Sequence, residues 1–395
     1  MKQVKTILGL TGIICSMILI SCNNTPTVSN KEEFSKPDTI KKTDSVKPVI
    51  DEKAVRLNDI AKIIAGLPVD SISDLFNITQ TTEWKKYNED ATKVWGKFFE
   101  MSEKIKTWAG KEIPAATDTV KTVFYPFGGP DFLFANIFFP TAIKYIMIGL
   151  EDAGSIPVLD TIRKENLKST WSLYKSAIED VIQLSFFRTN DMKNDLDSNH
   201  IDGTTPIIML FLARSGKNIL EVNPMRLSDD GKLVYIDKNI KDFKSVKNHA
   251  MEIVFKDDSG SIVKRIYYLS TNLSDVGLKA NLPFKAYLNN AGDHVITFLK
   301  SATYLMHKSY FSIIRNTCLN KSVLILQDDS GIGYKFFKKD KWDISLYGVY
   351  NKPIPLFEEF YEEDLFNAFK EHSKHLNFRI GYNNKSNLLI AKRIK

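Results

Sequence analysis

Cysteine is scarce in this chain of 395 residues, which contains three. Cys15 and Cys22 lie within the first 22 residues, so Cys318 is alone in the rest of the sequence. One thiol cannot form an internal disulfide. Cys318 lies in an apolar helical pattern over residues 309–319, which favours a small buried side chain over a reactive thiol. The fold must therefore be stable without disulfide bonds.

The sequence also lacks the short motifs that identify common enzyme classes. It has no Gly-x-Ser-x-Gly elbow and no His-Glu-x-x-His run. His372 and His375 lie three residues apart on an expected helix, but a third metal ligand is not evident, and exposed helix histidines are the favoured interpretation. We expect His307, beside an apolar stripe, to be structural. Whether the protein is an enzyme is left open by these patterns.

Blocks of like charge are missing too. The formal net charge of +7 falls to about +5 without Lys2 and Lys5, and the remaining basic residues are interspersed with acidic ones. This pattern does not indicate nucleic-acid binding. Ordinary solubilising charge is favoured over weak attraction to an anionic membrane surface.

The N-terminus carries a recognisable pattern. Lys2 and Lys5 precede an apolar run over residues 7–20, which leads to Ser21 and Cys22. A positive start and an apolar stretch of about 7 to 15 residues are typical of a signal peptide. The segment resembles the signal of a bacterial, Bacteroidetes-type lipoprotein. This resemblance implies cleavage after residue 21 and a palmitate-type lipid anchor on Cys22 in the cell envelope; the alternative is an uncut signal anchor.

Residues 22–51 form an expected disordered tether. They are rich in Asn, Thr, Ser, Lys, Asp and Pro, and cannot bury enough apolar surface to fold. Such a coil reaches about 30 Å. Lys31-Glu32-Glu33 resembles the signals that direct some lipoproteins to the cell surface, but it lies further from the cysteine than those signals do. We expect an outer-membrane attachment, with periplasmic and surface-facing orientations both open.

The rest of the chain alternates between helical and strand-like patterns. We expect an N-terminal helical segment over residues 52–114 and an α/β body over 115–395. Helical patterns cover residues 52–65, 82–109, 131–139, 160–185, 207–215, 293–319 and 362–375. Strand-like patterns cover residues 120–127, 144–150, 322–326, 342–347 and 378–382, with a hairpin ending at 394 and an antiparallel meander at about 217–275. The predicted fold is mixed α/β, with a central mixed sheet covered by helices.

Small and acidic residues follow several of the apolar strands. Ligands of open α/β sheets bind beyond the carboxyl ends of the strands, where loops and helix N-termini converge. The segments concerned are Gly128-Gly129-Pro130-Asp131, Glu151-Asp152-Ala153-Gly154-Ser155, Gln327-Asp328-Asp329-Ser330-Gly331-Ile332-Gly333-Tyr334 and Gly348-Val349-Tyr350. Turn residues of these types also occur for conformational reasons alone.

The sequence Asp-Asp-Ser-Gly occurs twice, which provides an internal comparison. Asp257-Asp258-Ser259-Gly260 joins two alternating strands, where a solvated turn explains it. Asp328 and Asp329 instead end an unbroken Val-Leu-Ile-Leu run, typical of a strand buried on both faces. Two carboxylates at that place could hold a divalent cation or act as general acid and base, so they are the catalytic and metal-ligand candidates. The alternative is again a solvated turn.

Two further segments are candidate binding elements. Gly128-Gly129-Pro130-Asp131 could present backbone N–H groups to an anion, although it lacks the Lys and Ser or Thr of a phosphate loop, and an N-cap Asp131 is the simpler interpretation. Phe187-Arg188-Thr189-Asn190-Asp191 places a cation among hydrogen-bonding groups. Arg188 could clamp a carboxylate or phosphate, or pair with a neighbouring acid.

Four stretches, residues 125–139, 185–192, 300–307 and 326–334, resemble blocks of a family of exported bacterial proteins of uncharacterised activity. The resemblance implies export and no catalytic residue.

Three functions are consistent with these patterns. The leading hypothesis is a membrane-anchored envelope protein that binds a small polar or anionic ligand, with Asp131, Glu151, Arg188, Asn190, Asp191, Ser330 and Tyr334 as lining candidates. The alternatives are a carboxylate-dependent or metal-dependent hydrolase of an envelope glycan or phosphoester, and a structural partner of another envelope protein. Two or more carboxylates about 5 to 9 Å apart around a cleft would favour hydrolysis, whereas one carboxylate among N–H donors would favour binding.

Overall fold

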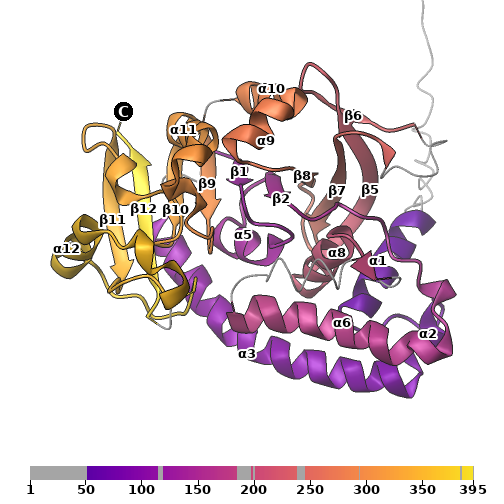
Figure 1. Cartoon of the computed structure of the whole chain (residues 1–395). Coiled ribbons are helices and arrows are strands. Elements are labelled where there is room, and N and C mark those ends of the chain that lie inside the picture. Colours follow the sequence, from indigo (N-terminus) through magenta and orange to yellow (C-terminus); the bar gives the residue numbers. More distant parts are fainter. Residues whose placement is uncertain are drawn as a thin grey trace, which may run out of the picture. The chain divides into compact units, whose positions relative to one another are not determined.

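Ten strands of the described chain form one mixed sheet (Figure 1). The computed structural model describes residues 51–113, 119–184, 197–198, 201–237, 245–292, 294–382 and 385–394. The expected signal peptide, the lipidation site at Cys22 and nearly all of the expected tether lie outside these residues. The strand order is β11-β12-β10-β9-β1-β2-β8-β7-β5-β6. The strands are β1 (Thr122–Tyr125), β2 (Lys144–Gly149), β5 (Lys217–Leu227), β6 (Leu233–Tyr235), β7 (His249–Asp257), β8 (Lys264–Ser270), β9 (Val295–Leu299), β10 (Ser322–Gln327), β11 (Trp342–Gly348) and β12 (Asn387–Arg393).

The centre of the sheet is parallel and both sides are antiparallel. Strands β10, β9, β1, β2 and β8 are parallel neighbours, so their carboxyl ends meet at one edge of the sheet. The expected meander continues from β8 through β7 and β5 to β6. On the other side, β12 pairs antiparallel with both β10 and β11. A separate two-stranded sheet joins β3 (Asp197–Ser198) and β4 (Ile201–Asp202).

Helices cover both faces of the sheet. Alternate residues of the central strands enter two different hydrophobic clusters, as the period of two in a strand requires: Tyr145 and Met147 of β2 face one, Ile146 and Ile148 the other. The first cluster contains side chains of α1 (Glu52–Ile64), α3 (Thr82–Glu112), α5 (Phe132–Phe138), α6 (Leu167–Glu179) and α8 (Thr205–Arg214). The second contains side chains of α9 (Asp275–Ala280), α10 (Leu282–Asn290), α11 (Ser312–Lys321) and α12 (Glu363–His372).

The first helices begin where local chemistry favours a start. The Asp51 side chain accepts hydrogen bonds from two amides of the first turn of α1, and the Thr81 hydroxyl accepts one from Trp84 in α3. The aromatic stripe of α3 is buried, as its helical spacing predicts. A short helix, α2 (Phe76–Thr79), precedes α3. No helix of the described residues is long and apolar enough to cross a membrane.

The mixed α/β class, the helix-covered sheet, the meander and the N-terminal helices are confirmed. The helix expected over residues 293–319 is wrong in its first half. Residues 295–299 are the buried central strand β9, and α11 begins at Ser312. A short, mainly apolar run does not distinguish a buried strand from a helix, and here pairing with β1 and β10 decides it.

Two other expectations fail near the C-terminus. Residues 378–382 form no strand, and the expected terminal hairpin is absent because β12 pairs with β10 and β11. Smaller differences concern helix ends. Gly110 lies inside α3, α6 begins at Leu167, and Thr204 is the N-cap residue of α8. The Thr205 hydroxyl donates a hydrogen bond to the Ala153 carbonyl at 2.7 Å.

Candidate functional site

The chain reverses its direction of winding between β1 and β9. From β1 it proceeds to β2 on one side, whereas β9 leads to β10 on the other. The loops that follow these strands therefore diverge and leave a crevice beyond the carboxyl ends. Ligands of open α/β sheets bind at such a switch point.

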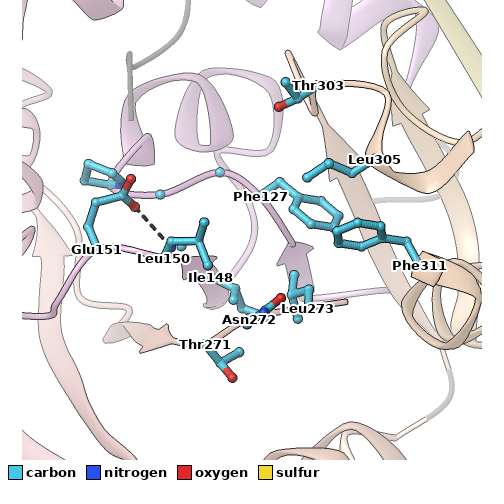
Figure 2. Close-up of a pocket in the computed structure, with 14 residues that line it drawn as sticks. Phe127, Ile148, Leu150, Glu151, Thr271, Asn272, Leu273, Thr303, Leu305 and Phe311 are labelled. Atoms are coloured by element: carbon cyan, nitrogen blue, oxygen red, sulfur yellow. Dashed lines mark hydrogen bonds between the residues drawn. The ribbon is translucent and has the colours of Figure 1, made fainter. Parts of the chain in front are cut away.

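The crevice at this place has a volume of about 160 Å³ (Figure 2). Its walls come from the loops after β1, β2, β8 and β9, together with the segment that precedes α11. The described lining residues are Phe127, Gly128, Gly129, Pro130, Ile148, Gly149, Leu150, Glu151, Thr271, Asn272, Leu273, Thr303, Leu305 and Phe311. The crevice thus lies at the edge of the sheet that the strand-end rule indicates.

Glu151 is the one ionisable side chain among these described lining residues. Its Oε2 accepts a hydrogen bond from the Leu150 amide at 3.2 Å. Burial raises the pKa of the Glu151 carboxyl. The site therefore contains one carboxylate beside an N–H donor, and hydroxyl and amide groups of Thr271, Asn272 and Thr303 provide the remaining side-chain polarity.

Glycine leaves the room that Glu151 occupies. A Cβ atom on Gly149 would lie 2.7 Å from Glu151 Oε2 and 3.0 Å from the Gly129 Cα. Gly129 has a φ of +53°, a backbone conformation that favours glycine. The two glycines thus let the loops after β1 and β2 approach each other beside the carboxylate.

Backbone strain is concentrated around the crevice. Six described non-glycine residues have a positive φ, and four of them, Phe127, Ser301, Thr303 and Tyr304, belong to the loops after β1 and β9. A left-handed conformation is unfavourable for an aromatic residue and more so for a β-branched threonine. Strain of this kind persists where the surrounding structure enforces it, and it is common at ligand sites.

Hydrogen bonds from the loop after β10 hold the loop after β9 in its strained conformation. Asp328 Oδ2 accepts a hydrogen bond from the Ser301 amide at 2.8 Å, and Ser330 Oγ accepts one from the Ala302 amide at 2.7 Å. The Ser330 carbonyl accepts another from the Tyr304 amide at 3.0 Å. The second Asp-Asp-Ser-Gly copy is therefore the support of a crevice wall.

Asp329 supports the same loop from a different side. It accepts hydrogen bonds from the Tyr304 hydroxyl and from Asn387 Nδ2, the latter at 2.9 Å. Asn387 Oδ1 in turn accepts from the Asp329 amide at 2.8 Å. Both Asp328 and Asp329 are buried, with exposed fractions of 1% and 6%, and neither is among the residues that line the crevice. The alternative of a solvated turn does not apply to them.

Asp131 follows the crevice residue Pro130 in the chain and is buried. Its carboxylate caps α5 through the Phe134 amide at 3.2 Å and accepts from the Tyr125 hydroxyl at 2.9 Å. It also pairs with Lys300 Nζ at 2.7 Å, and both side chains are almost fully buried. Asp131 is thus the N-cap that the simpler interpretation predicts, and its charge is matched by a lysine.

Burial dominates the titration of these charged groups. It raises the pKa of Asp131 despite the Lys300 charge, and lowers the pKa of Lys300. Burial together with the neighbouring Asp329 charge raises the pKa of Asp328 to about 7, and burial raises the pKa of Asp329. Perturbed carboxyl groups often mark active sites, but buried structural networks perturb pKa values as well.

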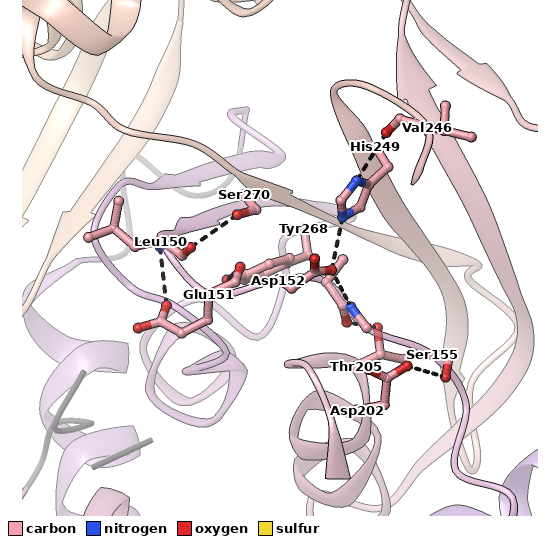
Figure 3. Close-up of polar contacts among 12 residues, drawn as sticks. Leu150, Glu151, Asp152, Ser155, Asp202, Thr205, Val246, His249, Tyr268 and Ser270 are labelled. Carbon is pink, nitrogen blue, oxygen red and sulfur yellow. Dashed lines mark hydrogen bonds and ion pairs between the residues drawn. The ribbon is translucent and has the colours of Figure 1, made fainter. Parts of the chain in front are cut away.

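The loop after β2, which carries Glu151, is held by a second network (Figure 3). The Tyr268 hydroxyl donates to the Glu151 carbonyl at 3.0 Å, and Ser270 Oγ donates to the Leu150 carbonyl at 3.2 Å. Asp152 contacts His249 Nε2 at 2.9 Å. These contacts fix the backbone of Glu151 while its carboxyl group faces the crevice.

The remaining predicted residues do not line the crevice. Ser330 is buried and bonded to Asp328 and to the loop after β9. Tyr334 begins a separate short helix (Tyr334–Phe336), and its amide donates to Glu362 Oε2 at 2.9 Å. Arg188, Asn190 and Asp191 lie outside the described residues. Glu151 is the candidate that the structure places in the crevice wall.

The apolar part of the lining was missed by sequence reasoning. Thr303 and Leu305 follow β9, which the helical interpretation of residues 293–319 concealed. Phe127 lies two residues after the end of β1, yet an aromatic residue at a strand end does not by itself indicate a binding site. Within the described part of the chain, no group of three or more His, Cys, Asp or Glu residues could hold a metal ion.

Comparisons of this chain with protein-family models, with curated proteins and with solved structures found no match.

Proposed function

We propose that this protein is a lipid-anchored protein of the bacterial cell envelope whose α/β body binds a small polar ligand in the crevice at the carboxyl ends of β1, β2, β8 and β9. The crevice carries this proposal because it combines the favoured position in the fold with one carboxylate, Glu151, beside an N–H donor. The lipid anchor on Cys22 rests on the N-terminal sequence pattern.

Binding is better supported than hydrolysis. A carboxylate-dependent hydrolase needs two carboxyl groups that reach the substrate from opposite sides. Asp328 and Asp329 are buried and accept hydrogen bonds from Ser301, Ser330, Tyr304 and Asn387, which leaves Glu151 alone in the described wall. The strained loops also suit a preorganised binding site, because they fix the walls before the ligand arrives.

A thermal-shift screen tests the binding site. The full chain is screened against sugars, amines, carboxylates, phosphates and divalent cations, and each hit is repeated with Leu150→Trp. Leu150 lines the crevice and is 64% exposed, so a larger ring there blocks the crevice without entering the core. Ile262→Trp is the matched control, since Ile262 is 61% exposed in the turn at the opposite ends of these strands.

A hit that Leu150→Trp abolishes and Ile262→Trp preserves supports the crevice as the binding site. Absence of any hit, or hits that survive Leu150→Trp, would refute it.

The anchor is tested separately with a clickable palmitate analogue in cells. Labelling and membrane fractionation of the protein should both be lost in Cys22→Ser. Labelling that persists in this variant would exclude Cys22 as the acylated residue.

A further inference from the structure

The two ends of the crevice differ in chemistry. Figure 2 shows the Glu151 side chain at one end of the crevice and the rings of Phe127 and Phe311 with Leu305 at the other. The two rings pack edge to face, with centroids 5.9 Å apart. A ligand that fits both ends needs an apolar or aromatic body and a polar group that complements a carboxylate.

The charge of the described wall excludes an anion as the best partner. No lysine, arginine or histidine is among the described lining residues. The nearby buried cation, Lys300, pairs with Asp131 at 2.7 Å. Backbone donors are also engaged: the Gly129 amide donates to the Ile148 carbonyl at 3.1 Å, and the Phe134 amide at the start of α5 donates to Asp131.

Glu151 has acceptor capacity to spare. A carboxylate offers about four lone-pair positions, and the Glu151 carboxyl accepts from two backbone amides, that of Leu150 at 3.2 Å and its own. Burial raises the pKa of Glu151, because the groups around it stabilise its ionised form less than water does. A cation at this position supplies that stabilisation, and a charge-assisted hydrogen bond in a partly buried site is stronger than a neutral one.

Size limits the ligand further. A volume of about 160 Å³ holds a small molecule rather than a polymer segment.

We infer that the crevice binds a small organic amine, with its ammonium group hydrogen-bonded to Glu151 and its apolar or aromatic body against Phe127 and Phe311. This inference rests on the proposed function and specifies the ligand class of the same site.

Three probes of nearly equal size separate charge from shape: benzylamine, benzyl alcohol and benzoate. Each is titrated by isothermal calorimetry at neutral pH into the full chain, into Glu151→Gln and into Leu150→Trp. Glu371→Gln, which removes an exposed carboxylate of α12, is the control for net charge. Benzylamine should bind about tenfold or more tightly than benzyl alcohol, as expected for a hydrogen bond to a charged group, and benzoate should bind most weakly. Glu151→Gln should remove the preference for the amine, and Glu371→Gln should leave it unchanged.

The outcomes distinguish the ligand class from the site. Equal or stronger binding of benzyl alcohol or benzoate, blocked by Leu150→Trp, overturns the amine while the crevice stands as a binding site. An amine preference that survives Glu151→Gln also overturns the inference. If none of the three probes binds but the thermal-shift screen finds another ligand that Leu150→Trp blocks, the amine is wrong and the proposed site stands; if the screen is empty too, both fail.

Discussion

Asp328 Oδ2 accepts a hydrogen bond at 2.8 Å from the backbone amide of Ser301, a residue with a left-handed φ of +53°. The two residues lie in the loops that follow the neighbouring parallel strands β10 and β9. One buried carboxylate thereby holds the strained loop that forms a wall of the crevice. In the other Asp-Asp-Ser-Gly copy, the corresponding residue is Asp257, which ends β7 and pairs with Lys217 and Lys264, while Asp258 is exposed.

The two copies of the tetrapeptide provide a buried aspartate, Asp328, and an exposed one, Asp258, for a mutational test. Asp328→Ala leaves the buried Ser301 and Ser330 amides without their acceptor, and an unsatisfied buried donor costs about 1–3 kcal/mol. We expect a loss of at least about 2 kcal/mol in the free energy of unfolding, measured by urea denaturation. Asp258→Ala, the exposed control, should change it by less than about 0.5 kcal/mol. Equal effects of the two substitutions would contradict the supporting role of Asp328.

Stability should depend on pH through the same carboxyl group. The pKa of Asp328 is about 7 in the folded chain, against an ordinary value of 3.8 that applies when the chain is unfolded. Between these two pKa values the folded state binds more protons than the unfolded state. The stabilising contribution of Asp328 to the free energy of unfolding is therefore fully present below about pH 4. It falls by up to about 1.4 kcal/mol per pH unit and is lost as the pH rises through 7.

Urea denaturation from pH 4 to 8 measures this slope. Asp328→Asn should be less stable overall, because an amide cannot accept from both Ser301 and Ser330 through two oxygens, yet its slope should be flatter. A variant slope as steep as that of the native chain would show that Asp328 is not the titrating group.

Crevice geometry depends on the missing side chain of Gly149. In Gly149→Ala the new Cβ would overlap the Tyr268 hydroxyl and lie 2.7 Å from Glu151 Oε2, so both side chains must move. We expect a stability loss of about 1–3 kcal/mol, as for other overpacked sites, together with weaker binding of any crevice ligand. Gly96→Ala, in the middle of α3 with open space around it, should instead stabilise the chain by roughly 0.5–1 kcal/mol. Unchanged ligand binding in Gly149→Ala would show that Glu151 is not held as described.

Cys318 should be chemically inert in the folded chain. It is free and buried, and burial raises the pKa of its thiol to about 12. The thiolate is the reactive form, so iodoacetamide at pH 8 should modify the native residue more than about a hundredfold more slowly than the urea-unfolded one. Mass spectrometry of the peptide that contains Cys318 follows the reaction. Comparable rates in the two states would contradict the buried position.

Much of the fold follows from local patterns. The buried stripe of α3, the alternation in β7 and β8 and the continuous apolar run of β10 each depend on side chains close in sequence, and each was predicted. The strand β9 was not, because its short run of four apolar residues and Thr297 satisfies helix and strand alike until neighbouring strands pair with it. That omission also hid Thr303 and Leu305 from the expected site.

The sequence by itself determined the class of fold, the edge of the sheet at which the crevice lies, and an N-terminal pattern that predicts export and lipidation. Only the tertiary structure decided which carboxylate lines that crevice. Asp328 and Asp329 have the more conspicuous sequence, but hydrogen bonds to residues 25 or more positions away hold them in the interior, whereas Glu151 is left at the wall beside two glycines. Burial of a side chain depends on strand order and on loops that are distant in sequence, and no local pattern contains that information.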